Sequence, residues 1–106
     1  MPQFLYRIEP TRAGMLAEGP TPRETEIIGA HFHYLEGLTK QGIVLMAGRT
    51  LTRDARTFGI VVFVAESETR AAEIRAGDPA IREGVMRSEL FPYQVALWSD
   101  RNPMAK

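Results

Sequence analysis

Residues 43–65 read IVLMAGRTLTRDARTFGIVVFVA and carry the most information about the architecture. Two apolar runs flank a short polar segment at residues 52–56, which has the length and composition of a hairpin connection. We therefore predict a strand at Ile43–Leu51 and a second strand at Thr57–Ala65, paired with each other.

Both of these strands are apolar on both sides. In the first strand, alternation places Ile43, Leu45, Ala47 and Leu51 on one side and Val44 and Met46 on the other. An antiparallel sheet whose second face meets water carries polar residues on that face. Helices from crossovers would cover only one face here, so the other face needs an apolar partner. We predict a homodimer formed through this sheet face around a two-fold axis.

Toward the N-terminus, the residues of Gln3–Ile8 alternate as expected for a first strand. Pro10–Pro20 is predicted to be a loop. A helix is predicted over Thr21–Gln41, because Thr21 and Glu24 form a capping box at its start.

Toward the C-terminus, Ser67 is placed to cap a shorter helix at Glu68–Ala76, which Gly77 ends. Pro79–Gly84 is predicted to be a turn of helix or an irregular segment. Ser88–Ser99 is predicted to be the last strand.

The predicted element order is β-α-β-β-α-β, which is typical of the α+β, ferredoxin-like fold. In this fold a four-stranded antiparallel sheet carries two helices on one face. The chain has 106 residues, so we predict a single domain over residues 1–99 and a frayed tail over residues 100–106.

The composition narrows the classes of function. Thirteen basic and thirteen acidic residues cancel, so we expect neither nucleic acid nor a membrane surface as a partner. The absence of cysteine excludes disulfides, thiolate metal sites and a cysteine nucleophile. No secretory leader is recognised, and the longest apolar run, Ile60–Ala65, is too short to span a bilayer. We expect a cytoplasmic protein.

His31 is the most unusual residue of the predicted first helix. At about 100° per residue it lies within the apolar stripe formed by Ile27, Leu35 and Leu38, whereas His33 lies on the opposite side. An imidazole against a core needs a hydrogen-bond partner. His31 is therefore either a structural histidine or an acid–base residue that works near neutral pH.

Asp78 is the second candidate, within Gly77-Asp78-Pro79. The two helices of a ferredoxin-like fold pack side by side, which brings Asp78 within reach of His31. A carboxylate there would orient the imidazole and fix its tautomer. The alternative is that these three residues only end the helix and form a turn.

Three further residues are candidates for substrate binding. Arg49, at the end of the predicted second strand, would hold a carboxylate group through a bidentate contact. Arg7 is assigned the same role, and Tyr6 would supply a phenol hydroxyl. We expect no metal site and no cofactor, because one histidine and one distant aspartate are too few ligands and no glycine-rich phosphate loop is present.

Four segments, Gly29–Leu35, Gly42–Gly48, Ser67–Ala72 and Gly77–Pro79, resemble the YciI-like (YCII-related) family. The resemblance runs from Phe4 to about Leu97. It implies a dimeric α+β barrel and a site built on a histidine and an aspartate, which would be His31 and Asp78. Activity is mostly unassigned in this family, although a dehydrochlorinase that acts on a chlorinated hydroxymuconate is similar.

The chain departs from the family pattern twice. Arg49 stands where many members have proline, and Ala80 stands where many have an aromatic residue. Both changes would alter the wall of a site. The leading hypothesis is a small cofactor-independent lyase or isomerase that transfers a proton on a small carbonyl or carboxylate compound. The alternative is a non-catalytic dimeric module that binds or senses a small ligand.

Overall fold

The computed structural model describes residues 1–104. It contains the predicted order of strands and helices, with a short helix, α1, inside the segment predicted as a loop, and a turn of helix, α4, where a turn of helix or an irregular segment was predicted. The elements are β1 (Gln3–Pro10), α1 (Gly14–Ala17), α2 (Pro22–Lys40), β2 (Val44–Arg49), β3 (Gly59–Val64), α3 (Glu68–Ala76), α4 (Pro79–Arg82) and β4 (Met86–Tyr93).

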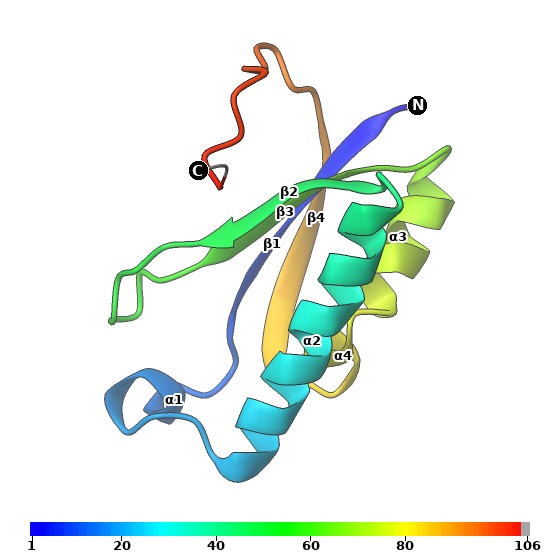
Figure 1. Cartoon of the computed structure of the whole chain (residues 1–106). Helices are drawn as coiled ribbons and strands as arrows, with labels where there is room; N and C mark the ends of the chain where they lie inside the picture. The colour runs from blue at the N-terminus through cyan, green and yellow to red at the C-terminus, as the bar shows by residue number, and fades with distance from the viewer. Residues whose placement is uncertain (105–106) are drawn as a thin grey trace.

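The four strands form one sheet in the order β2-β3-β1-β4, and every neighbouring pair is antiparallel. The two longer helices, α2 and α3, lie on the same face of this sheet (Figure 1). The predicted ferredoxin-like α+β fold is therefore confirmed.

Local sequence explains where the two main helices begin. The Thr21 hydroxyl accepts a hydrogen bond from the Glu24 backbone N–H at 3.1 Å, and the Glu24 carboxylate accepts one from the Thr21 backbone N–H at 2.8 Å. This is the predicted capping box, and it satisfies two of the backbone donors that every helix start leaves free. Ser67 caps α3 by accepting from the Arg70 backbone N–H.

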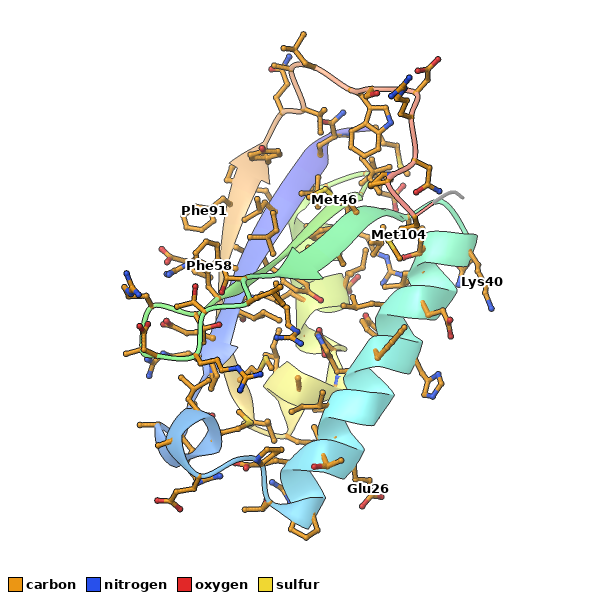
Figure 2. All side chains as sticks on the ribbon, turned by 60° about the vertical axis from the view of Figure 1, so that its left-hand side comes forward. Glu26, Lys40, Met46, Phe58, Phe91 and Met104 are labelled. Carbon is orange, nitrogen blue, oxygen red and sulfur yellow. The ribbon has the colours of Figure 1, made fainter. Side chains whose placement is uncertain are left out.

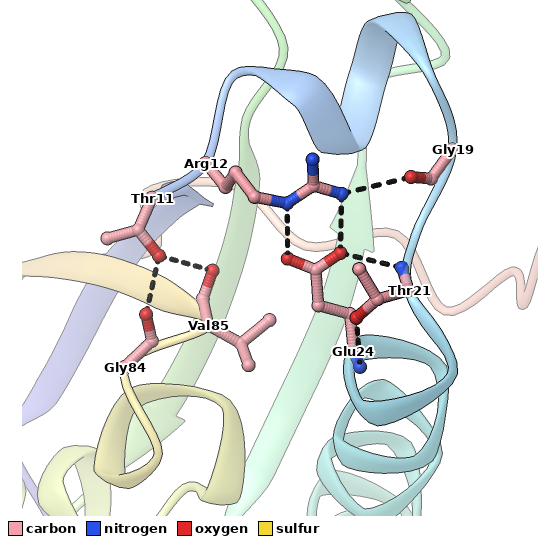
Figure 3. Close-up of polar contacts among 7 residues, drawn as sticks. All are labelled: Thr11, Arg12, Gly19, Thr21, Glu24, Gly84 and Val85. Carbon is pink, nitrogen blue, oxygen red and sulfur yellow. Dashed lines mark hydrogen bonds and ion pairs between the residues drawn. The ribbon is translucent and has the colours of Figure 1, made fainter.

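The loop between β1 and α2 is tied to the domain at two points (Figure 3). Thr11 donates to the Val85 carbonyl at 2.7 Å, ahead of β4. The Arg12 guanidinium donates twice to the Glu24 carboxylate, at 2.7 and 2.8 Å, and once to the Gly19 carbonyl. The Arg12 contact, followed by the Thr21 backbone N–H, lowers the pKa of Glu24 to about 2. The loop is therefore fixed to the N-terminus of α2.

Alternation along β1 and β3 builds the core on the helix side of the sheet. Tyr6 of β1 and Phe63 of β3 are fully buried at its centre. Their rings lie 5.7 Å apart. Other buried members of this core are Phe4, Ile8, Leu35, Val44, Val61, Ala65, Ala71 and Ile74.

The sides assigned to β2 were partly wrong. Val44 pairs with Phe63 and is buried, whereas Met46 pairs with Val62 and is exposed. The register shifts between Val44 and Met46, so one extra residue reverses the alternation at this point. The strand is also shorter than predicted, because it begins at Val44 and ends at Arg49.

We call the side of the sheet opposite α2 and α3 the free face. Figure 2 shows Phe58 and Phe91 on this side, away from α2. The free face combines apolar and charged side chains. By register these are Leu5, Arg7, Glu9, Met46, Ile60, Val62, Val64, Arg87, Glu89, Phe91 and Tyr93.

The last strand ends at Tyr93 and not at Ser99 as predicted. Residues 94–104 contain no helix or strand, and Leu97 and Trp98 are exposed. The predicted tail is described only to residue 104; residues 105–106 lie outside the described part. No helix within residues 1–104 is long and apolar enough to cross a membrane.

Candidate functional site

Asp78 lies in the turn between α3 and α4 and is completely buried. Its backbone is extended, as expected for a residue before proline, and Pro79 occupies the first position of α4. The Asp78 side chain caps α4 by accepting from the Ala80 backbone N–H at 3.0 Å. The turn chemistry expected from Gly77-Asp78-Pro79 is therefore present, but it uses only part of this carboxylate.

The imidazole of His31 also contacts the Asp78 carboxylate. His31 Nδ1 lies 2.7 Å from Asp78 Oδ1 and 2.8 Å from Oδ2, although 47 residues separate the two positions. The His31 side chain keeps 13% of its surface exposed, whereas the Asp78 side chain keeps none. α2 and the α3–α4 turn thus bring the two predicted site residues into direct contact, with the histidine on the solvent side.

The third partner of Asp78 is Tyr6, which sequence reasoning had assigned to substrate binding. The Tyr6 hydroxyl donates to Asp78 Oδ2 at 2.7 Å from the centre of β1. Burial, and then the nearby Asp78 charge, raise the pKa of Tyr6, so its hydroxyl stays protonated at neutral pH. Because Tyr6 is fully buried and its hydroxyl is engaged, it has no surface to offer a substrate.

Three donors therefore converge on one buried carboxylate. They are the Tyr6 hydroxyl, the Ala80 backbone N–H and the His31 ring nitrogen Nδ1. An ionised carboxylate offers acceptors only, so the His31 nitrogen that faces it carries a proton. The neutral imidazole then presents the lone pair of its other nitrogen, Nε2. Nε2 is the atom of this site that can accept or deliver a proton.

Tyr34 belongs to the same region and was not predicted as part of it. It follows His31 by three residues, a spacing that places both side chains on one side of α2. Its hydroxyl donates to the Ile74 carbonyl at 2.6 Å, near the end of α3. A Cβ atom on Gly77 would lie 2.9 Å from this hydroxyl. Tyr34 thus holds the end of α3 just before Asp78, and Gly77 leaves room for it.

The two candidate arginines lie in different places. Arg7 is on the free face, where its guanidinium stacks on Phe58 at 4.7 Å, so it does not lie beside His31. The cause is alternation, because Tyr6 and Arg7 point to opposite faces of β1. Arg49 pairs with Gly59, and a Cβ atom placed on Gly59 would point toward Ile8 in the core. Arg49 is therefore on the helix side of the sheet, at its edge, and is exposed.

Two of the surface hollows in the described part of the chain lie away from His31. One, of about 610 Å³, lies between the start of β1, the end of β4 and the start of α3. The other, of about 210 Å³, is lined by four charged residues and one serine of β1 and β4. Within the described part of the chain, no three His, Cys, Asp or Glu side chains are grouped as a metal site would require.

A model of the YCII-related domain matches residues 5–94. The chain therefore belongs to the YCII-related family. No curated protein matches it. Among solved structures, this YCII-related chain is similar to 5-chloro-2-hydroxyhydroquinone dehydrochlorinase from Burkholderia phenoliruptrix AC1100 in complex with 2,5-dihydroxybenzoquinone. The identity is 21%, 87% of this chain and 93% of that chain are covered, and the TM-score is 0.66.

Two other similar structures have lower TM-scores. One is a formyltetrahydrofolate deformylase from Pseudomonas putida KT2440, with 19% identity, a TM-score of 0.44 and coverage of 88% of this chain and 29% of that chain. The other is a protein designed de novo with a ferredoxin fold, with 18% identity, a TM-score of 0.39 and coverage of 99% and 96%.

Proposed function

We propose that this YCII-related protein is a small acid–base enzyme of the lyase or isomerase type. In this proposal His31 Nε2 takes a proton from, or returns it to, a small carbonyl or carboxylate compound. Asp78 orients the imidazole and stabilises the positive charge that forms on it during the transfer. The observation that carries the proposal is the contact between the buried Asp78 carboxylate and Nδ1 of the partly exposed His31.

The dehydrochlorinase with the same fold suggests a first class of substrate. Removal of HCl needs one base that accepts a proton, while chloride leaves with the electron pair of the carbon–chlorine bond. No electrons are gained or lost overall, so the step needs no redox partner. A single imidazole held in one tautomer fits this demand. Chlorinated hydroxyhydroquinones are therefore the first probes to try, followed by unsaturated hydroxy acids.

Arg49 keeps its proposed role as the group that binds an acidic substituent of the substrate. Its guanidinium is on the same face of the sheet as His31 and Asp78, at the exposed edge strand. A planar guanidinium recognises a carboxylate through two parallel hydrogen bonds. Substitution of Arg49 with Gln should therefore raise KM for acidic probes and leave neutral probes unaffected.

The decisive experiment compares the two histidines. His31→Gln should abolish turnover of 5-chloro-2-hydroxyhydroquinone, followed by chloride release and by NMR. His33→Gln is the matched control, because His33 lies on the same helix with 82% of its side chain exposed, and it should keep full activity. Undiminished turnover by His31→Gln would refute the proposal. Binding of the probes without any product would favour the ligand-binding module instead.

We also propose that two copies associate through the free face. Phe91 and Tyr93 of β4 are exposed there, at 38% and 46%, and Met46 of β2 at 42%. Monomers rarely leave a large apolar patch of this kind in water. Phe91→Glu should lower the mass measured by light scattering from that of two chains to that of one. Phe32→Glu, at an exposed site on α2, should not change it. A single-chain mass for the unmodified protein would refute this proposal.

A further inference from the structure

The hydroxyl of Tyr6 is the feature that the catalytic proposal leaves unused. The ring alone would fill the core, since it packs against Phe63 between Phe4 and Ile8. Phenylalanine would do this without burying a polar group, which is costly unless that group finds a partner. The partner here is Asp78 Oδ2, 72 residues away in the chain. The hydroxyl therefore matters for the carboxylate more than for packing.

The Tyr6 contact fixes a carboxylate that is otherwise free to turn. Ala80 N–H holds Oδ1, and the Tyr6 hydroxyl holds Oδ2. With both oxygens held, the plane of the carboxylate is set and faces His31 Nδ1 at 2.7 and 2.8 Å. The three contacts come from β1, α2 and α4. The Tyr6 side chain thus links the position of β1 to the orientation of Asp78 and, through it, of the His31 imidazole.

We propose that Tyr6 is a positioning residue of the His31–Asp78 site. Its hydroxyl holds the Asp78 carboxylate turned toward Nδ1, and this keeps His31 in the tautomer with the proton on Nδ1 and the lone pair on Nε2. Tyr6 touches no substrate and acts only through Asp78. The tautomer part of this inference stands on the geometry alone, whereas its kinetic part rests on the proposed function.

Tyr34 provides the matched comparison. It is also a tyrosine beside Asp78, but its hydroxyl bonds the Ile74 carbonyl and not the carboxylate. Loss of either hydroxyl removes one internal hydrogen bond and keeps the ring. Only the loss of the Tyr6 hydroxyl should change the state of His31.

The test is to read the protonation of each His31 nitrogen by long-range proton–nitrogen NMR at a pH where the ring is neutral. His33→Gln assigns the signals, since the chain has two histidines. The unmodified protein should show the Nδ1-protonated tautomer for His31. Tyr6→Phe should convert it to a mixture of tautomers, and Tyr34→Phe should leave it unchanged. The measurement on the unmodified protein needs no variant to fold, and an Nε2-protonated tautomer there would overturn the inference.

Kinetics give the second readout. Tyr6→Phe should lower kcat roughly ten- to a hundredfold, which is what the loss of one hydrogen bond to a charged group corresponds to, with little change in KM. Unchanged tautomer and kcat in Tyr6→Phe would refute the positioning role while leaving the proposed function intact. A tautomer change in a protein that converts none of the probes would support the positioning role and count against the proposed function.

Discussion

Replacing Asp78 with asparagine changes two measurable properties by different amounts. Asparagine keeps the shape of the side chain and one acceptor oxygen, but it puts an NH₂ group where the second oxygen was. If the remaining oxygen is Oδ1 and stays on the Ala80 N–H, the NH₂ group replaces Oδ2, so that it faces the Tyr6 hydroxyl and lies beside His31 Nδ1. The tyrosine hydroxyl can turn to accept a hydrogen bond, whereas the NH₂ group opposes the proton on Nδ1 and favours the His31 tautomer with its proton on Nε2.

The effect on stability follows from the weaker hydrogen bonds that a neutral amide makes with these two side chains. Hydrogen bonds to a charged group contribute about 1.5–3 kcal/mol each and neutral ones about 1 kcal/mol, so exchanging two of them costs about 2 kcal/mol. The effect on turnover is larger, because His31 in the wrong tautomer has no lone pair at Nε2. A catalytic histidine whose aspartate is changed to asparagine loses roughly 10⁴-fold in kcat.

Both effects are read from one protein preparation. Urea unfolding at pH 7 gives the free energy of unfolding, and chloride release from the chlorinated probe gives kcat. Asp54→Asn is the control, because Asp54 pairs with Arg56 in an exposed turn and such pairs contribute about 1 kcal/mol at most. An Asp78→Asn protein that matches the unmodified one in either kcat or the free energy of unfolding would contradict the reasoning.

Three further predictions concern stability. Gly77→Ala should cost about 1–3 kcal/mol in urea unfolding, because the new Cβ would press on the Tyr34 hydroxyl at 2.9 Å; no change would contradict the close packing. Because the folded-state pKa of Glu24 is lowered to about 2, its contribution is present above about pH 4.5 and lost toward pH 2. Arg12→Ala should therefore flatten the acid side of a plot of thermal midpoint against pH, and an unchanged acid side would contradict this. The pKa of Tyr6 is raised by burial, so its contribution is complete below about pH 10 and is lost above it. Tyr6→Phe should reduce the loss of thermal midpoint between about pH 9 and 11, and an equally steep loss would count against it.

Much of the fold could be predicted because the relevant signals are local. Thr21 and Glu24 lie three residues apart and cap α2 with no help from the rest of the chain. The order of strands and helices followed from hydrophobic periods and turn residues in the same way. In β2, an extra residue between Val44 and Met46 reversed the predicted sides. This irregularity depends on how β2 pairs with β3, and the sequence of β2 alone does not indicate it.

The site was predicted less completely. The helical period pointed to His31, and the turn residues pointed to Asp78, but their contact spans 47 residues and required the two helices to pack. Tyr6 was assigned to the substrate, because an alternating strand does not reveal what its buried hydroxyl will meet. Arg7 was assigned to substrate binding, although alternation places it on the face of β1 opposite Tyr6.

The sequence by itself determined the elements, their order and the inward direction of one imidazole, because these depend on neighbours within a few residues. Only the tertiary structure decided that a tyrosine from the first strand, a histidine from the long helix and a backbone N–H from the last crossover share one carboxylate. A buried carboxylate needs hydrogen-bond donors, and the donors that lie close enough to reach it come from distant parts of the sequence that only the complete fold brings together.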